Sequence, residues 1–269
     1  PYFDAVFVPL MTPVLFLMAI GPFVRWKKDE APGLVLRLRW APGEAATRYA
    51  ISLSDDAADW RPARRVVDGN GGVDPIALPE SEARYVRVDV EAGEGARIGL
   101  AEVTVEPLAF AATPNDFVKS IAQAAPRGTY PRGFHGEQPY WTVVGIDGGP
   151  DQGLIGEDGA IELGKGGFSI EPFVVSAGRL VTWADVETAQ SLQDGYLPIP
   201  SVRWTHPDFA LDVTAFAHGT PERSQLVGRY RLTNTGATAR DYTLALAARP
   251  LQVNPPTQFL SVTGGVSPI

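Results

Sequence analysis

The chain has 269 residues, of which 45% are hydrophobic and 10% aromatic, so it can bury a core and is not globally disordered. Its 28 glycines and 24 prolines make up about a fifth of the residues, which disfavours a helical bundle and favours a fold with many turns. With 31 acidic against 23 basic residues, a generally basic nucleic-acid binder is excluded. The absence of cysteine excludes disulfides, a thiolate nucleophile and cysteine-bound metals, and it is compatible with either redox compartment.

A run of twenty uncharged, mostly apolar residues occupies positions 5–24, a length that suffices to cross a bilayer core. The basic residues Arg25, Lys27 and Lys28 follow this run, which is the reverse of a secretory signal peptide and would place the following chain on the cytoplasmic side. We therefore predict a hydrophobic, transmembrane-like helix over residues 1–33, with membrane contact through 5–24. Three prolines inside the run imply a parent protein with several spans.

Residues 1–28, PYFDAVFVPLMTPVLFLMAIGPFVRWKK, resemble a transmembrane segment of the cytochrome c biogenesis haem-lyase membrane protein. A generic hydrophobic helix would give the same run, and the haem-ligand motif of that family is missing, so its activity is not implied. Residues 1–48 contain six basic and four acidic residues, so the net charge of −8 leaves −10 on the remainder. This contrast, the start at Pro1 and the end at Ile269 lead us to expect a piece of a longer protein, and a possible chimera.

Short alternating segments dominate residues 34–107: Leu34–Trp40, Tyr49–Ser54 and Tyr85–Val90. Alternation with period two, interrupted by glycine-rich turns, is typical of half-buried antiparallel strands. The fold class that we predict is mainly β. It consists of two antiparallel β-sandwich units, joined by a short helix and preceded by the hydrophobic segment.

Three phrases in this first unit resemble the discoidin family, the coagulation factor type C domains. They are Arg48–Asp56 followed by Trp60, then Ala83–Val88, then Gly99–Val105. The resemblance covers the later half of such a domain and implies a partial sandwich over 34–107 whose relatives bind sugars through loops. Trp60 could stack on a sugar, or it could be a core tryptophan that follows a strand.

The second unit is expected over residues 112–269. A helix should begin at Thr113-Pro114 and end before Pro126, because proline and an acidic residue suit the first helical turn. Strands are then expected at Tyr140–Ile146, Phe168–Val175, Arg179–Val186, Phe209–Phe216, Gln225–Thr233 and Tyr242–Ala248. The last two should pair across the turn Asn234–Gly236.

This unit resembles the β-sandwich that precedes the (α/α)-barrel of bacterial glycogen-debranching-like glycoside hydrolases. Its strand-like phrases include Tyr140–Gly145, Leu154–Gly159, Gly166–Phe173 and Tyr230–Gly236. In such proteins the catalytic carboxylates lie on the helical barrel, and no repeated helical pattern follows here. The resemblance therefore implies that the remainder of the parent chain is a partner of this unit.

Six carboxylates between positions 147 and 171 form the richest candidate for chemistry: Asp147, Asp151, Glu157, Asp158, Glu162 and Glu171. Two carboxylates at a suitable separation could hydrolyse a glycosidic bond by acid–base catalysis. Several of these residues stand in glycine-rich turns, where Asp and Gly are favoured for turn geometry alone. Both interpretations stay open, and Asp147 is kept as a candidate sugar-binding residue.

Trp141, Trp183 and Trp204 could line a sugar groove, although tryptophan on a strand lies more often in the core. A near P-loop at 159–166 lacks the terminal Ser or Thr and precedes a strand, which argues against nucleotide binding. The three histidines lack metal-binding spacing. We expect neither a catalytic residue, nor a metal, nor a cofactor in this chain.

The sequence thus predicts non-catalytic, carbohydrate-associated β-sandwich modules from the N-terminal side of a larger glycoside-hydrolase-like protein. They would bind a glycan or support the helical barrel, and they would not bind nucleic acid. Two alternatives remain: a glycoside hydrolase with its carboxylates within 147–171, and a fragment of a cytochrome c maturation membrane protein.

Overall fold

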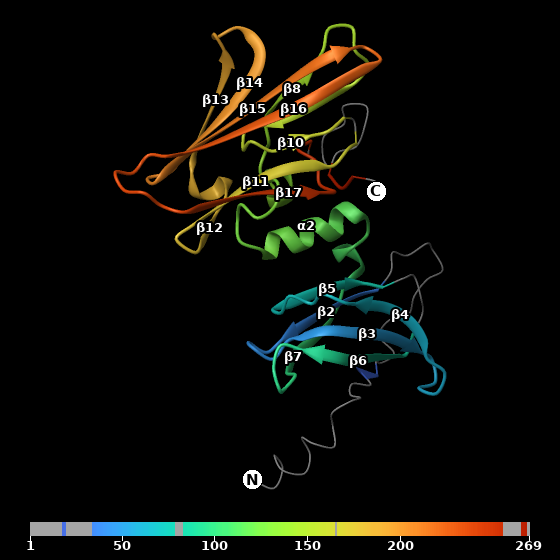
Figure 1. The fold of residues 1–269 in the computed structure, drawn as a ribbon. Helices are drawn as coiled ribbons and strands as arrows, with labels where there is room; N and C mark the ends of the chain where they lie inside the picture. Colours follow the sequence, from blue (N-terminus) through green and yellow to red (C-terminus); the bar gives the residue numbers. More distant parts are fainter. Residues whose placement is uncertain (1–17, 20–33, 79–82, 165, 255–264, 268–269) are drawn as a thin grey trace. The chain divides into compact units, whose positions relative to one another are not determined.

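The computed structural model describes residues 18–19, 34–78, 83–164, 166–254 and 265–267 (Figure 1). It is mainly β, with antiparallel sheets and one short α-helix in the described part, as the alternating segments predict. The chain divides into two compact units, Pro1–Phe117 and Val118–Ile269.

In its described part, the first unit contains two antiparallel sheets. One has the strand order β1-β6-β3-β4 and the other the order β5-β2-β7. Alternate side chains of the facing strands point into a shared core. The strand bounds are β1 (Met18–Ala19), β2 (Val35–Trp40), β3 (Ala46–Ser54), β4 (Arg61–Val66), β5 (Val73–Ala77), β6 (Tyr85–Gly93) and β7 (Leu100–Glu106).

One carboxylate joins the two sheets of the first unit. Asp74 on β5 accepts hydrogen bonds through the same oxygen from Trp40 Nε1 at 2.8 Å and from the Tyr49 hydroxyl at 2.7 Å. Trp40 lies on β2 and Tyr49 lies on β3 of the facing sheet, and both aromatic side chains are buried. Burial, together with this hydrogen bond to Asp74, raises the pKa of Tyr49. The polar ends of two core aromatics are thereby satisfied without exposing them to water.

The predicted membrane-like helix over 1–33 lies outside the described residues except at two positions. There, Met18 and Ala19 form strand β1, which pairs with Val86 and Tyr85 of β6, so at these positions the structure shows a strand and not a helix. In the part of the chain that the structure describes, no helix is both long enough and apolar enough to cross a membrane.

The predicted helix at Thr113-Pro114 is confirmed as α2 (Pro114–Ala124). The Thr113 hydroxyl accepts a hydrogen bond from the backbone N–H of Asp116 at 3.1 Å and donates one to its carboxylate at 2.8 Å. This exchange satisfies a donor that would otherwise be unpaired in the first turn. The division between the two units falls within this helix.

Two antiparallel sheets of the second unit enclose a single core that includes Trp204, Phe209 and Leu211. One sheet has the order β12-β11-β10-β9-β8, with β17 also paired to β11, and the other has the order β13-β14-β15-β16. The strand bounds are β8 (Trp141–Gly145), β9 (Gln152–Gly156), β10 (Ile161–Glu162), β11 (Ser169–Ser176), β12 (Arg179–Val181), β13 (Glu187–Gln193), β14 (Leu197–Thr205), β15 (Phe209–Thr220), β16 (Arg223–Asn234) and β17 (Tyr242–Arg249).

The predicted pairing of the last two strands is wrong. Strand β16 pairs along its whole length with β15, whereas β17 pairs with β11 in the other sheet. The connection between β16 and β17 therefore passes from one sheet to the other. Tyr230 and Leu232 of β16 and Tyr242 and Leu244 of β17 do share a core, but they reach it from opposite sheets. Alternation predicts which face is buried and cannot identify the neighbouring strand.

The strand predicted at Arg179–Val186 also ends early. Strand β12 stops at Val181, and a short 3₁₀ helix follows at Trp183–Asp185. The Thr182 hydroxyl accepts a hydrogen bond from the backbone N–H of Ala184, and the Asp185 carboxylate accepts one from the backbone N–H of Thr182. This reciprocal cap stabilises a helical turn where alternation alone favours a strand.

A buried ion pair joins β11 to β17. Arg249 donates to both carboxylate oxygens of Glu171, through Nε at 2.9 Å and through Nη2, while Ser169 donates to the same carboxylate. The remaining guanidinium nitrogen Nη1 donates to the backbone carbonyl of Thr129 at 2.7 Å. Only 4% of Glu171 is exposed, so its charge has no substitute partner in water.

Replacing Glu171 with Gln should lower the free energy of unfolding of the second unit by about 3 kcal/mol, because it leaves the Arg249 charge poorly compensated. The matched control is Arg203→Gln, which breaks a solvent-exposed ion pair with Asp212 and should cost less than about 1 kcal/mol. Urea unfolding followed by tryptophan fluorescence measures both values. Equal effects of the two substitutions would contradict this assignment.

Candidate functional site

Two of the predicted sugar-stacking tryptophans of the second unit, Trp183 and Trp204, belong to one buried core cluster. Trp204 is fully buried and donates from Nε1 to the backbone carbonyl of Asp158 at 2.9 Å. Trp183 is 6% exposed, and the guanidinium groups of Arg127 and Arg132 lie 4.5 and 4.2 Å from its ring centroid. Both side chains are buried, as is common for tryptophan near strands. Trp141 is half-buried at the beginning of β8.

Trp60 belongs to the first unit, and its interpretation as a core tryptophan is wrong. It is half-buried and lies outside the core cluster. The guanidinium group of Arg87 lies 4.5 Å from its ring centroid. Because the alternate residues Val86 and Val88 of β6 are in the core, Arg87 and Trp60 lie on the outer face of the sheet.

The turn before Trp60 is built by hydrogen bonds to its own backbone. The Asp56 carboxylate accepts hydrogen bonds from the backbone N–H groups of Ala58 and Asp59 at 2.8 and 2.9 Å, and these bonds lower its pKa. Asp55 forms an ion pair with Arg61 at 3.0 Å. The Asp56 side chain therefore forms an Asx turn. Within the described residues, no group of three His, Asp or Glu side chains is arranged to hold a metal ion.

Burial separates the carboxylates between 147 and 171 into distinct groups. Asp147 and Asp151 are exposed in the turn between β8 and β9. Glu157 is half-buried, with its carboxylate 3.3 Å from Arg132 Nε. The other three are buried and hydrogen-bonded within the fold: Asp158, Glu162 and Glu171.

Asp158 has the most unusual environment of this group. Its side chain accepts a hydrogen bond of 3.3 Å from the backbone N–H of Ala160, and the residue is 7% exposed. Desolvation raises the pKa of this carboxyl group to about 6, and the nearby Arg132 opposes the shift only in part. Burial likewise raises the pKa of Glu162, whose carboxylate accepts from the backbone N–H of Asn254 at 3.1 Å. Such groups are poorly placed to meet a substrate from solvent.

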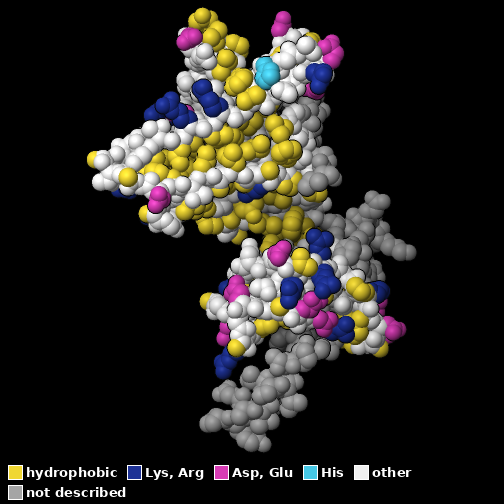
Figure 2. Space-filling view, in the orientation of Figure 1, with side chains coloured by type: hydrophobic (Ala, Val, Ile, Leu, Met, Phe, Trp, Pro, Cys, Tyr) yellow, Lys and Arg dark blue, Asp and Glu magenta, His cyan; other side chains and the backbone are white. Residues whose placement is uncertain are grey.

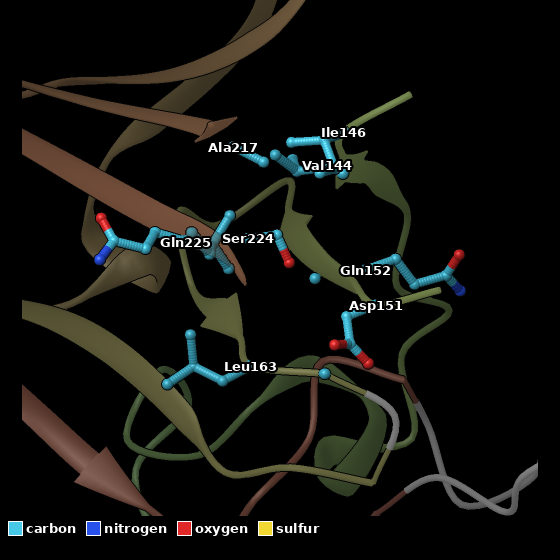
Figure 3. Close-up of a pocket in the computed structure, with 12 residues that line it drawn as sticks. Val144, Ile146, Asp151, Gln152, Leu163, Ala217, Ser224 and Gln225 are labelled. Atoms are coloured by element: carbon cyan, nitrogen blue, oxygen red, sulfur yellow. The ribbon is translucent and has the colours of Figure 1, made fainter. Parts of the chain in front are cut away.

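An open pocket of about 160 Å³ lies at one end of the second unit (Figure 3). Three segments form it: the β8–β9 hairpin, the end of β10, and the β15–β16 hairpin. The lining residues are Val144, Gly145, Ile146, Asp151, Gln152, Gly153, Leu163, Gly164, Ala217, Ser224, Gln225 and Leu226. At ~30 Å³ per water molecule, the volume corresponds to about five waters, which suits one small ring rather than a long chain.

The polar groups of the pocket differ in direction. In Figure 3 the Ser224 side chain points into the space between the strands, while the amide groups of Gln152 and Gln225 extend away from it on opposite sides. Within the described residues, the side chains of Asp151 and Ser224 have no hydrogen bond or ion pair to other protein groups. A carboxylate acceptor and a hydroxyl are therefore free to bind a ligand beside the apolar Val144, Ile146 and Leu163.

Gly153 allows the strands beneath the pocket to approach closely. A Cβ atom at this position would lie 2.8 Å from the backbone carbonyl oxygen of Glu162 and would also collide with the side chain of Leu226. The absence of a side chain thus lets β9 pack against β16.

Sequence reasoning identified Asp151 only as one of six carboxylates and missed Ser224. Asp151 stands beside Ser224 because the β8–β9 and β15–β16 hairpins meet, and the two residues are 73 positions apart. No local sequence pattern predicts that these two hairpins lie close together. The predicted Asp147 lies in the same turn as Asp151 but is not among the residues that line the pocket.

Comparison of the chain with family models, with curated proteins and with solved structures found no match. The resemblances to discoidin domains, to glycoside-hydrolase-associated sandwiches and to the cytochrome c maturation protein therefore stay predictions from the sequence.

Asp158→Asn should flatten the pH dependence of stability. Desolvation raises the pKa of Asp158 from 3.8 to about 6, so the folded state holds this proton more tightly than the unfolded chain. The wild type should therefore lose stability as the pH rises from about 4 to about 6, by roughly 3 kcal/mol from this group. The asparagine variant should lose less over the same interval.

Urea unfolding of the second unit at pH 4, 5 and 7 measures this difference. Asp147→Asn, at an exposed position of the same region, is the control and should keep the wild-type pH profile. Parallel profiles for Asp158→Asn and the wild type would contradict the assignment.

Proposed function

We propose that the chain is a non-catalytic, carbohydrate-associated pair of β-sandwich modules, and that the pocket of the second unit holds one sugar residue of a glycan. The observation that carries this proposal is a pair of groups without a partner among the described residues, the Asp151 carboxylate and the Ser224 hydroxyl, at an open pocket of about 160 Å³. Sugar hydroxyls both donate and accept hydrogen bonds, so they suit this pair. The apolar wall suits the C–H face of a sugar ring.

The carboxylate content of the pocket supports a binding role over hydrolysis. Glycoside hydrolases generally use two carboxyl groups, about 5–9.5 Å apart, on either side of the scissile bond. Among the residues that line this pocket, Asp151 is the single carboxylate. Asp158 and Glu171 are buried away from solvent, and Glu171 is engaged by Arg249.

The support of an (α/α)-barrel elsewhere in a longer parent chain is part of the same proposal, and it rests on the sequence resemblance. The two alternatives are distinguishable from it. A hydrolase would need residues within 147–171 to reach the substrate. A membrane fragment would depend on residues 1–33, which lie almost entirely outside the described part.

Asp151→Asn should weaken binding of the glycan identified on a glycan array by about tenfold or more, because hydrogen bonds to a charged group contribute about 1.5–3 kcal/mol. Asp147→Asn removes a neighbouring charge outside the pocket wall and should leave the affinity unchanged. Isothermal titration calorimetry with the array hit measures both.

The same samples are assayed for release of reducing sugar. We expect none from the wild type. Release that disappears in Asp151→Asn would favour the hydrolase alternative, and failure of the wild type to bind any glycan would overturn the binding proposal.

A further inference from the structure

The outer face of the sheet β13-β14-β15-β16 is rich in arginine, although the protein carries a net charge of −8. Trp204, Leu211 and Leu232 point into the core, so the adjacent residues of each strand point outward. Strands β14 and β16 carry the arginines of this sheet, and Figure 2 shows dark-blue side chains near the region of β13 and β14. This face is distinct from the pocket, which lies at the end of the β15–β16 hairpin.

The strand registers arrange the outward side chains in two rows across β14, β15 and β16. The first row is Arg203, Asp212 and Arg231, and the second is Ser201, Thr214 and Arg229, in which Thr214 is covered and its hydroxyl is hydrogen-bonded to that of Ser201. The first row thus combines one carboxylate with two guanidinium groups, and the second row combines two hydroxyls with one guanidinium group.

The two rows leave two positive charges uncompensated. Arg203 satisfies Asp212 through Nη1, at 2.9 and 3.1 Å from its two carboxylate oxygens. Arg231 and Arg229 on β16 are exposed, and neither has an ion pair within the described residues. Arg229 makes only a 3.4 Å hydrogen bond to the Thr214 hydroxyl. Both guanidinium groups can therefore bind an anion by donating hydrogen bonds to it.

Next to these rows lies an apolar patch. Phe216 of β15 stands opposite Val227 of β16, both half-buried, and the His218 ring centroid is 6.4 Å from that of Phe216. Arg229 and Arg231 are two residues apart on one strand face, a separation of about 7 Å. The face therefore offers spaced cations beside a surface on which a ring can stack.

We propose that this face binds an acidic polysaccharide whose charges are carboxylates, with Arg229 and Arg231 each engaging a uronate group and Phe216 contacting a sugar ring. Guanidinium groups bind carboxylates with paired hydrogen bonds, which favours Arg over Lys at such sites. The proposal rests on the carbohydrate association proposed above but names a second ligand class and uses other residues.

Charge density favours this occupant over nucleic acid. A DNA duplex carries one charge per about 1.7 Å of its axis and is bound through many basic side chains. Here two arginines are free, Asp212 lies in the same row, and the whole chain is acidic. A sparsely charged, hydroxyl-rich polymer fits this balance of charge.

The test uses polygalacturonate as the probe, with its fully methyl-esterified form as the uncharged control ligand. The wild-type chain should bind polygalacturonate, with an affinity that falls as salt increases, and should not bind the ester form measurably. The variant Arg229→Gln/Arg231→Gln should bind at least tenfold more weakly in calorimetry. Arg179→Gln/Arg64→Gln changes two exposed arginines on other strands and should bind as the wild type does.

Circular dichroism verifies that the variants are folded. The proposal is overturned if the wild type fails to bind polygalacturonate, if the ester form binds equally well, if both double variants bind alike, or if a single-stranded oligonucleotide binds more tightly. Asp151→Asn separates this proposal from the pocket. It should leave polygalacturonate binding intact, so failure at the pocket and failure at this face give different results.

Discussion

The ion pair between Glu171 and Arg249 reinforces the antiparallel pairing of β11 with β17 near one end of the two strands. It links β11 to β17 through two residues that are 78 positions apart, and through Thr129 it also holds the segment that follows α2. Strand β17 follows β16 in the chain but pairs with β11 in the other sheet. Its pairing with β11 therefore completes the second sheet that covers the core. Trp183 and Trp204 lie in the core that these two sheets enclose.

Alternation, a local property that each segment carries within itself, predicted strands such as β3, β6 and β15, but β13 and β14 were not predicted. Partner choice was not local. The alternation around Tyr230 and Tyr242 is the same whether their strands are neighbours in one sheet or face each other across a core. The structure shows the second arrangement. The early end of β12 depended on a side-chain cap between Thr182 and Asp185, which competes with alternation. The meeting of Asp151 and Ser224 depended on two hairpins and left no local signal.

Carboxylates in this chain illustrate that residue type and spacing do not define a site until burial is known. Asp158, Glu162 and Glu171 looked like candidates for acid–base chemistry, yet each is enclosed and hydrogen-bonded inside the fold. Fewer polar side chains of the described residues lack an ion pair within the fold, and they lie elsewhere. The two proposed ligand sites therefore use Asp151 and Ser224 in the pocket and Arg229 and Arg231 on β16.

Strand β16 has a second property that follows from its place at the edge of its sheet. In the described part of the chain it pairs with β15 alone, so the backbone groups on its other side have no strand partner along its twelve residues. Such an edge is a template for association with another chain, and charged side chains reduce that risk. Arg223, Arg229 and Arg231 place like charges along it, so two copies of this edge repel each other. The arginines of β16 thereby also favour colloidal stability of the isolated chain.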